Sequence, residues 1–289
     1  MPAFTQMKQN SSKQQPKTQA TNWRIPNDGT RLNLISQLPS NNNNSNGNCP
    51  NSNNINSKKI WLSVLSFFAT AVTLAWLPLL ALMVTLSAPV TNFLAELFVD
   101  TTNSELSHDY LVYIANETRA YTLGDDNANL PIFSGVGLPD SSREYTNDVI
   151  AHLLDVRVVF QACINAFIIA SIILLVCTIT LALKHKYVYI ARSLSQGATA
   201  VVALTVLIVI LGVLNFNALF NAMHQVFFAD GSWLFSYDSL LICALPEPFW
   251  IGCAIVLAST LLLFCTLAFV CARIIKYFVQ HKQLVVKHR

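Results

Sequence analysis

Two of the six histidines stand apart from the others and could carry chemistry. His152 lies six residues before a long charge-free stretch, and His224 lies inside another such stretch, near its end. An imidazole with a pKa of about 6.5 can accept a proton from a nucleophile and return one to a leaving group at neutral pH. The pair therefore predicts general acid-base catalysis by His152 and His224.

Carboxylates near the histidines allow a second chemistry. Asp155 follows His152 by three residues, so the two share one helix face and Asp155 is expected to orient the imidazole. His152 and His224 with Asp155 or Asp238 could instead supply three ligands of a catalytic zinc. No His-Glu-x-x-His sequence supports zinc, so proton transfer is favoured and no metal is expected. A Gly-x-Ser-x-Gly motif, a phosphate loop and a Cys-x-x-Cys motif are also absent, which leaves nucleophilic-serine, nucleotide and redox chemistry without support.

The residues after His224 mix aromatic and polar side chains. An interfacial aromatic belt accounts for most of the aromatic residues but not for His224. Helix-end capping and snorkelling could account for His152, Asp155 and Arg157. An ionisable residue at membrane depth is nevertheless a functional candidate by default. The expected substrate-binding residues are Arg157, at the membrane boundary, and Phe227, Phe228, Trp233 and Asp238.

The elements that must hold these residues are membrane-spanning helices. The chain has 289 residues, of which 53% are hydrophobic and 11% charged, against about 25% charged residues in average soluble domains. Its mean hydropathy is +0.46. Four charge-free runs each exceed the roughly 20 residues that a helix needs to cross a bilayer. The sequence predicts an all-α membrane protein with spans near residues 60–86, 157–183, 194–217 and 249–273.

Charge placement predicts the orientation and the remaining segments. Lysine and arginine gather before the first expected span, between the second and third, and after the fourth, whereas the expected loops 87–156 and 218–248 hold fourteen of the fifteen acidic residues. The positive-inside rule then puts both termini in the cytoplasm and both loops outside, where the first forms a small extracytoplasmic cap. The Asn-rich residues 1–59 are expected to form a disordered cytoplasmic tail, followed by a transmembrane domain at 60–275 and a basic tail at 276–289.

Two segments resemble the bacterial lipoprotein intramolecular transacylase family, Lit. They are residues 150–157, with His-Leu-Leu-Asp-Val at 152–156, and residues 216–250, with Met-His-Gln-Val-Phe-Phe at 223–228 and Leu-Pro at 245–246. The four-span layout with a long first outer loop is also similar. The similarity covers roughly residues 60–275.

This resemblance implies an inner-membrane enzyme that acts at the outer face of a bacterial membrane. Such enzymes move the sn-2 acyl chain of an S-diacylglyceryl cysteine to the α-amine of that N-terminal cysteine, which gives a lyso-form lipoprotein. The family's catalytic histidines match His152 and His224, Asp155 would orient His152, and Trp233 with the neighbouring phenylalanines would receive acyl chains. The implied partners are bacterial lipoproteins and membrane lipid, without nucleic acid, metal or other cofactor.

Two other functions remain open from the sequence. In the first, the protein is a non-enzymatic four-span scaffold or chaperone whose outer loops bind a partner, and both histidines are structural. In the second, it is a metal-dependent membrane hydrolase.

Overall fold

Long helices form in all four charge-free regions of the sequence. The computed structural model describes residues 52–132 and 140–287, and the long helices are α1 (Ser52–Thr85), α5 (Asn147–Leu183), α6 (Tyr187–Leu214) and α9 (Glu247–Lys287). All four are long and apolar enough to cross a membrane. The expected all-α, four-span fold is confirmed, and no named strand occurs within the described ranges.

Two of the long helices extend well beyond the spans expected from the charge-free runs. α5 begins at Asn147 instead of near residue 157, and α9 continues to Lys287. At the start of α5, the Thr146 hydroxyl accepts a hydrogen bond from the Val149 N–H, which satisfies one of the free donors of the first turn. Val149 and Leu153 then bury their side chains against the cap. Packing against protein thus continues the helix after contact with lipid has ended.

The long helices pack around α1. It contacts α5, α6 and α9, and α6 also packs along α9. The core of this bundle consists of Leu77, Ala81, Ala198, Val201, Leu261, Cys265 and Ala268. Gly197 on α6 faces Thr73 on α1 so closely that a Cβ there would lie 2.8 Å from the Thr73 Cβ. Small residues at such crossings let membrane helices approach each other.

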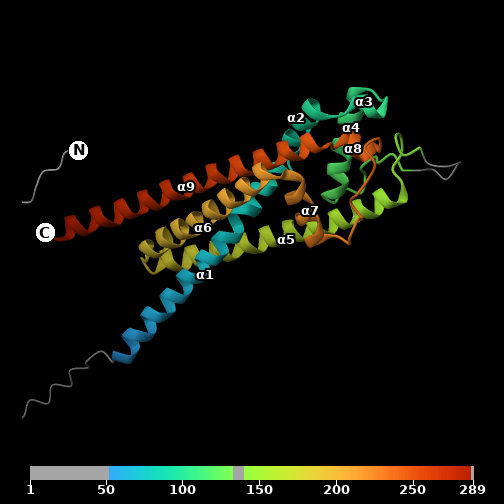
Figure 1. Cartoon of the computed structure of the whole chain (residues 1–289). Coiled ribbons are helices and arrows are strands. Elements are labelled where there is room, and N and C mark those ends of the chain that lie inside the picture. Colours follow the sequence, from blue (N-terminus) through green and yellow to red (C-terminus); the bar gives the residue numbers. More distant parts are fainter. Residues whose placement is uncertain (1–51, 133–139, 288–289) are drawn as a thin grey trace, which may run out of the picture. The chain divides into compact units, whose positions relative to one another are not determined.

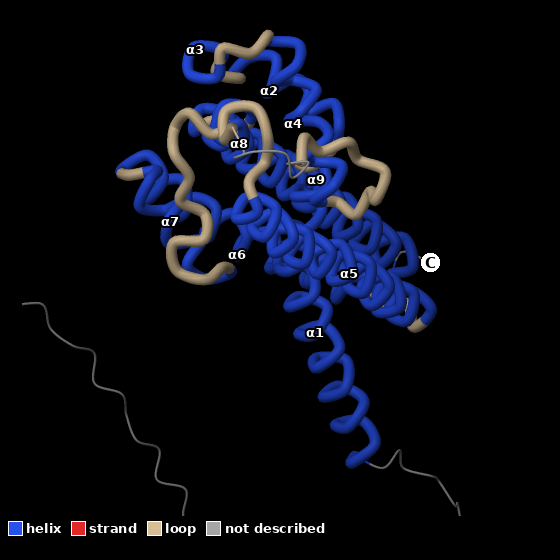
Figure 2. The backbone as a smooth tube through the Cα atoms, turned by 90° about the vertical axis from the view of Figure 1, so that its right-hand side faces the viewer, coloured by secondary structure: helices blue, strands red, loops and turns tan. Residues whose placement is uncertain are grey.

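Short helices form a cap at one end of the bundle. They are α2 (Ala88–Phe98), α3 (Thr101–Ser104), α4 (His108–Thr122) and α8 (Leu240–Ala244). Figure 1 and Figure 2 both show them together beyond that end. Leu94, Leu111, Ile114, Tyr145, Leu240 and Phe249 belong to its buried core, which also includes the start of α5. The cap therefore has its own hydrophobic core and shares it with the helix that carries His152.

One further helix, α7 (Phe216–Phe227), lies beside the bundle instead of crossing it. Asn215 has extended backbone angles and separates it from α6, and its side-chain Oδ1 accepts a hydrogen bond from the Ala218 N–H. The expected loop 218–248 therefore contains helical structure on both sides of a turn-rich segment.

The expected disordered tail falls largely outside the described residues. Residues 1–51 are not among them, whereas residues 52–59 belong to α1. The segment 276–287, expected to be a basic tail, continues α9.

Candidate active site

α5 and α7 bring His152 and His224 together, although 71 residues separate them in the sequence. His152 lies in the second turn of α5 and His224 in the last turn of α7, and their side chains are 7% and 8% exposed. The ring centroids are 6.2 Å apart and the ring planes are inclined by 24°. The two imidazoles can therefore act on one substrate group placed against them.

Aromatic side chains enclose the pair. Phe220, one helical turn before His224, has its ring centroid 4.0 Å from that imidazole. Phe228 contacts both histidines, at 5.0 Å from His152 and 5.4 Å from His224. The ring centroid of Trp233 lies 5.5 Å from that of His224, and the ring centroid of Phe235 lies 5.7 Å from that of His152. These rings surround the imidazoles with apolar surface, which excludes water and strengthens electrostatic interactions inside the site.

Hydrogen bonding fixes the tautomer of His224. Its Nδ1 lies 2.8 Å from the carbonyl oxygen of Phe220, which can only accept, so Nδ1–H is the donor. The lone pair of the neutral ring is then on Nε2, ready to accept a proton. Burial lowers the pKa of His224 from its ordinary value, and the bond to the Phe220 carbonyl opposes that shift in part. His224 is consequently neutral at pH 7.

His152 differs because one of its ring nitrogens is unsatisfied. Its Nδ1 is buried and has no hydrogen-bond partner in the described part of the chain. A buried polar atom without a partner costs about 1–3 kcal/mol, so such atoms often mark places where a ligand or water binds.

A hydrogen bond between α7 and the following segment supports the site. The Trp233 Nε1–H donates to Asn221 Oδ1 at 3.2 Å, and Asn221 lies three residues before His224. Trp233 is 7% exposed. This residue was expected to receive an acyl chain; the structure places it against His224 as one wall of the enclosure. Asn221 was missed by the sequence analysis, and its helical spacing from His224 is the signal that could have found it.

Asp155 and Arg157 do not join the histidines. Asp155 is exposed, and no hydrogen bond connects it with His152 among the bonds of the described residues. Arg157 donates to Asp126 Oδ1 at 2.6 Å and to the Gly124 carbonyl at 3.3 Å, and its guanidinium lies 5.1 Å from the centre of the Tyr121 ring. Arg157 therefore attaches α5 to the segment after α4.

The other expected substrate-binding residues lie at different depths. Phe228 contacts both imidazoles, whereas Phe227 is 54% exposed on the outside of α7. Asp238 is exposed. Burial raises the pKa of the Cys243 thiol to about 11, with smaller contributions from the negative charges of Asp100 and Asp238. Cys243 is thus a protonated thiol at neutral pH and a poor nucleophile.

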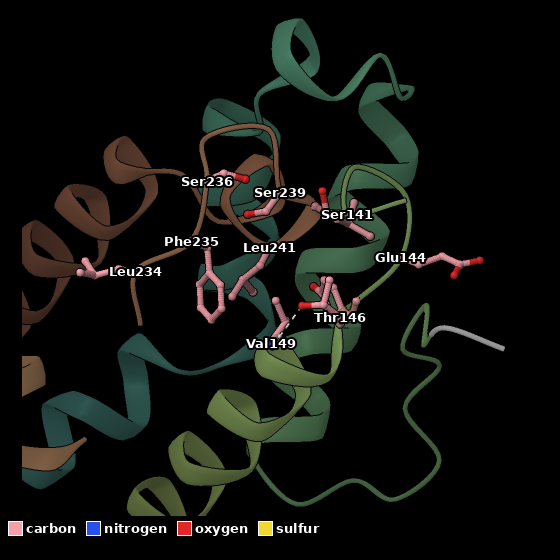
Figure 3. A pocket seen from close by; sticks show the side chains of 11 residues that line it. Ser141, Glu144, Thr146, Val149, Leu234, Phe235, Ser236, Ser239 and Leu241 are labelled. Atoms are coloured by element: carbon pink, nitrogen blue, oxygen red, sulfur yellow. Dashed lines mark hydrogen bonds between the residues drawn. The ribbon is translucent and has the colours of Figure 1, made fainter. Parts of the chain in front are cut away.

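A cavity of about 190 Å3 lies at the start of α5 (Figure 3). Its walls come from the segment before α5, from the first turn of α5, and from residues 234–241. Phe235 lines the cavity and also contacts His152. The sequence analysis did not identify this cavity, because its walls are distant in the sequence and carry no recognisable motif.

The described residues contain no group of three His, Cys, Asp or Glu side chains arranged to hold a metal ion. The expected alternative ligand set does not assemble, since Asp155 and Asp238 are both exposed. The arrangement suits proton transfer between groups held against two imidazoles.

Comparisons with known proteins bear on the family and the fold. The family model described as lipoprotein intramolecular transacylase Lit matches residues 60–250. The chain is similar in structure to the membrane integral lipoprotein intramolecular transacylase Lit from Bacillus cereus, with a TM-score of 0.63 and 17% identity over 78% of this chain and 99% of that one. A variant of that protein in which a histidine is replaced by arginine gives a TM-score of 0.61 and 16% identity, covering 81% of this chain and 99% of the other. No curated protein matches the chain.

Proposed function

The chain belongs to the lipoprotein intramolecular transacylase family Lit, and from that premise we propose that His152 and His224 move an acyl chain within one lipoprotein molecule. The acyl chain leaves the sn-2 position of the S-diacylglyceryl group and ends on the α-amine of the N-terminal cysteine. The observation that carries the proposal is the pair of imidazoles, 6.2 Å apart inside an aromatic enclosure.

In the proposed mechanism, the α-amine attacks the carbonyl carbon of the sn-2 ester and forms the new C–N bond. His224 accepts the amine proton at Nε2, the nitrogen that the Phe220 hydrogen bond leaves unprotonated. The C–O bond of the ester then breaks, and the imidazole pair delivers one proton to the departing glyceryl oxygen. One proton is taken and one is returned, no water is consumed, and the mass of the lipoprotein does not change.

The physical setting favours this reaction. An α-amine has an ordinary pKa of about 7.7–8.0, so a substantial fraction is neutral and nucleophilic at neutral pH. Donor ester and acceptor amine belong to the same molecule, and holding them together lowers the entropic part of the barrier. The aromatic walls exclude water that would otherwise hydrolyse the ester. Asp155 lies one helical turn from His152, where its charge stabilises an imidazolium.

The acyl chains of the substrate are proposed to reach the site along α7. The outer surface of this helix exposes Met223, Val226 and Phe227, at 42%, 75% and 54%. Such an apolar face suits contact with lipid. Phe228 and Trp233 continue the apolar surface inward to the histidines.

We propose that the cap and the histidine pair face the outer side of a bacterial inner membrane. The connection between α5 and α6 and the last turns of α9 lie at the end of the bundle opposite the cap (Figure 1). Basic residues gather at that end, namely Lys184, Lys186, Arg192, Arg273, Lys276 and Lys282. Under the positive-inside rule that end, with both termini, is cytoplasmic.

The test is expression in a bacterium whose lipoproteins lack N-acylation. Mass spectrometry of the N-terminal lipopeptide should show N-acyl-S-monoacylglyceryl cysteine at unchanged total mass, with fragment ions that locate each chain. His152→Ala and His224→Asn should each lower conversion by about 100-fold or more. The asparagine can keep the hydrogen bond to the Phe220 carbonyl while removing Nε2.

His281→Ala is the matched control, since His281 is exposed on the distal part of α9 and should be dispensable. Full conversion by both site variants would show that the histidine mechanism is wrong. Unchanged diacylglyceryl peptide from folded wild-type protein would show that the proposed reaction is wrong.

A further inference from the structure

Most of the aromatic enclosure around the histidine pair comes from one short segment. Three of its rings, those of Phe228, Trp233 and Phe235, lie in residues 228–235. Each ring centroid lies within 5.7 Å of the centroid of at least one imidazole. These residues are part of the loop between α7 and α8 (Figure 2), and we call them the covering segment. The exclusion of water from the site therefore depends on where this loop is held.

A side-chain hydrogen bond attaches the covering segment to α7. The Trp233 Nε1–H donates to Asn221 Oδ1 at 3.2 Å, across twelve residues of the chain. The backbone bonds inside the segment are local turns, such as that from the Ser232 N–H to the Ala229 carbonyl at 3.1 Å. No other side-chain hydrogen bond joins this segment to a neighbouring element in the described part of the chain. Asn221 is thus its polar anchor on the helix that carries His224.

The indole N–H of Trp233 needs this acceptor. Trp233 is 7% exposed, and an indole N–H can only donate a hydrogen bond. A buried donor without a partner is unfavourable, so an indole deprived of Asn221 moves until its N–H reaches water. That movement takes the ring away from His224, which now lies 5.5 Å from it between ring centroids. Asn221 itself is exposed, so its replacement leaves no cavity in the core.

We infer that Asn221 is a positioning residue that makes the amine, instead of water, the acceptor of the acyl chain. It acts through Trp233, whose indole it holds against His224. This inference rests on the proposed function, because it takes the lipoprotein ester as the substrate. Closure against water separates a transferase from a hydrolase when both reactions use the same base.

The competing reaction is hydrolysis of the same ester. When the indole is displaced, water reaches Nε2 of His224, the nitrogen that the bond to the Phe220 carbonyl leaves unprotonated. The water oxygen bonds to the ester carbonyl carbon while His224 takes a proton from the water. The ester C–O bond breaks, and the imidazole pair returns one proton to the departing glyceryl oxygen. One water molecule is consumed, and the products are a free fatty acid and S-monoacylglyceryl cysteine with an unacylated α-amine.

The test measures the ratio of the two products from one S-diacylglyceryl lipopeptide in nanodiscs. Mass spectrometry separates the N-acyl-S-monoacylglyceryl peptide from the S-monoacylglyceryl peptide, and hydrolysis without enzyme is subtracted. Both products come from the same folded molecules, so their ratio does not depend on how much protein folds. Asn221→Leu removes the acceptor at similar size and should raise the ratio of hydrolysis to transfer at least about tenfold, because a buried donor is left unpaired. A wild-type ratio in this variant would overturn the inference.

The matched control is Asn217→Leu on the same helix. Asn217 is exposed one helical turn before Asn221, and its side chain makes no hydrogen bond among those of the described residues. This variant should keep the wild-type product ratio. A rise equal to that in Asn221→Leu would assign the effect to α7 in general and overturn the role of Asn221.

Two further variants test whether the hydrogen bond is the cause. Asn221→Asp keeps an acceptor oxygen and should remain within about twofold of the wild-type ratio. Trp233→Phe removes the donor, so adding Asn221→Leu to it should not raise the ratio further. A tenfold rise in Asn221→Asp, or a further rise in the double variant, would show that Asn221 does not act through Trp233.

Failure of this inference differs from failure of the proposed reaction. If the proposed reaction is wrong, folded wild-type protein forms no N-acyl product. If only the role of Asn221 is wrong, the wild type forms that product and Asn221→Leu gives the same product ratio.

Discussion

Burial of His224 should determine how transacylation responds to acid. The neutral imidazole is the form that accepts the amine proton, and burial lowers its pKa below the ordinary 6.5. Activity carried by this base is therefore present above the lowered pKa and is lost as the pH falls through it. The rings of His152 and His224 titrate as neighbours, so a measured acid limb belongs to the pair.

The expected size of the effect follows from ordinary titration. An imidazole with a pKa of 6.5 would be half protonated at pH 6.5 and about ten-elevenths protonated at pH 5.5. Because the pKa of His224 is lowered, the fraction of His224 in the neutral, basic form should fall less than twofold at pH 6.5 and less than about tenfold at pH 5.5. The substrate amine imposes a separate tenfold fall per pH unit below about 7.7.

The assay is conversion of a soluble lipopeptide in nanodiscs from pH 5 to 8.5, followed by mass spectrometry. Each kcat/KM is divided by the neutral fraction of the amine, obtained by titrating the free lipopeptide. Trp233→Ala should expose His224 and so move the acid limb of this corrected pH–activity profile to higher pH. Trp61→Ala, a half-exposed tryptophan near Lys184 at the distal end of the bundle, should leave it unchanged. A wild-type limb centred at or above pH 6.5, or one that Trp233→Ala does not move, would refute the reasoning.

Two substitutions test the framework that holds the site. Gly197→Leu should destabilise the bundle by about 1–3 kcal/mol, measured by thermal unfolding in detergent, because a Cβ would lie 2.8 Å from Thr73 where carbon contacts are normally about 3.5–4.0 Å. An unchanged melting temperature would contradict the close α1–α6 crossing. Arg157→Gln should lower the melting temperature slightly and leave KM unchanged, because the guanidinium binds Asp126 and stacks near Tyr121. A raised KM at unchanged stability would instead assign Arg157 to the substrate.

The spans were predictable from the sequence because a hydrocarbon layer excludes charge, so each charge-free run marks a helix. The ends of those helices were less predictable. α5 starts ten residues before the span start expected near residue 157, since Val149 and Leu153 pack into the cap. Such packing depends on partners from α4 and α8 that lie far away in the sequence.

The histidine pair was predictable for a similar reason, because an ionisable residue at membrane depth needs a partner. Its surroundings were not. Asp155 has the right spacing to meet His152, yet the His152 side chain is buried in the protein and the Asp155 side chain is exposed. Helical spacing defines a shared face but not which residue at its edge is buried. Phe235 and Asn221 take part through contacts that only the folded loop creates.

The single extended residue between α6 and α7 sets where His224 lies. The Asn215 N–H closes the last turn of α6 on the Leu211 carbonyl, and its side chain opens α7 at Ala218. Without that interruption, α6 and α7 would merge into one continuous rod. His224, nine residues further on, would then stand about 13 Å beyond the break along the rod axis. The position of the His224 imidazole along the bundle axis thus depends on the two backbone angles, φ and ψ, of Asn215.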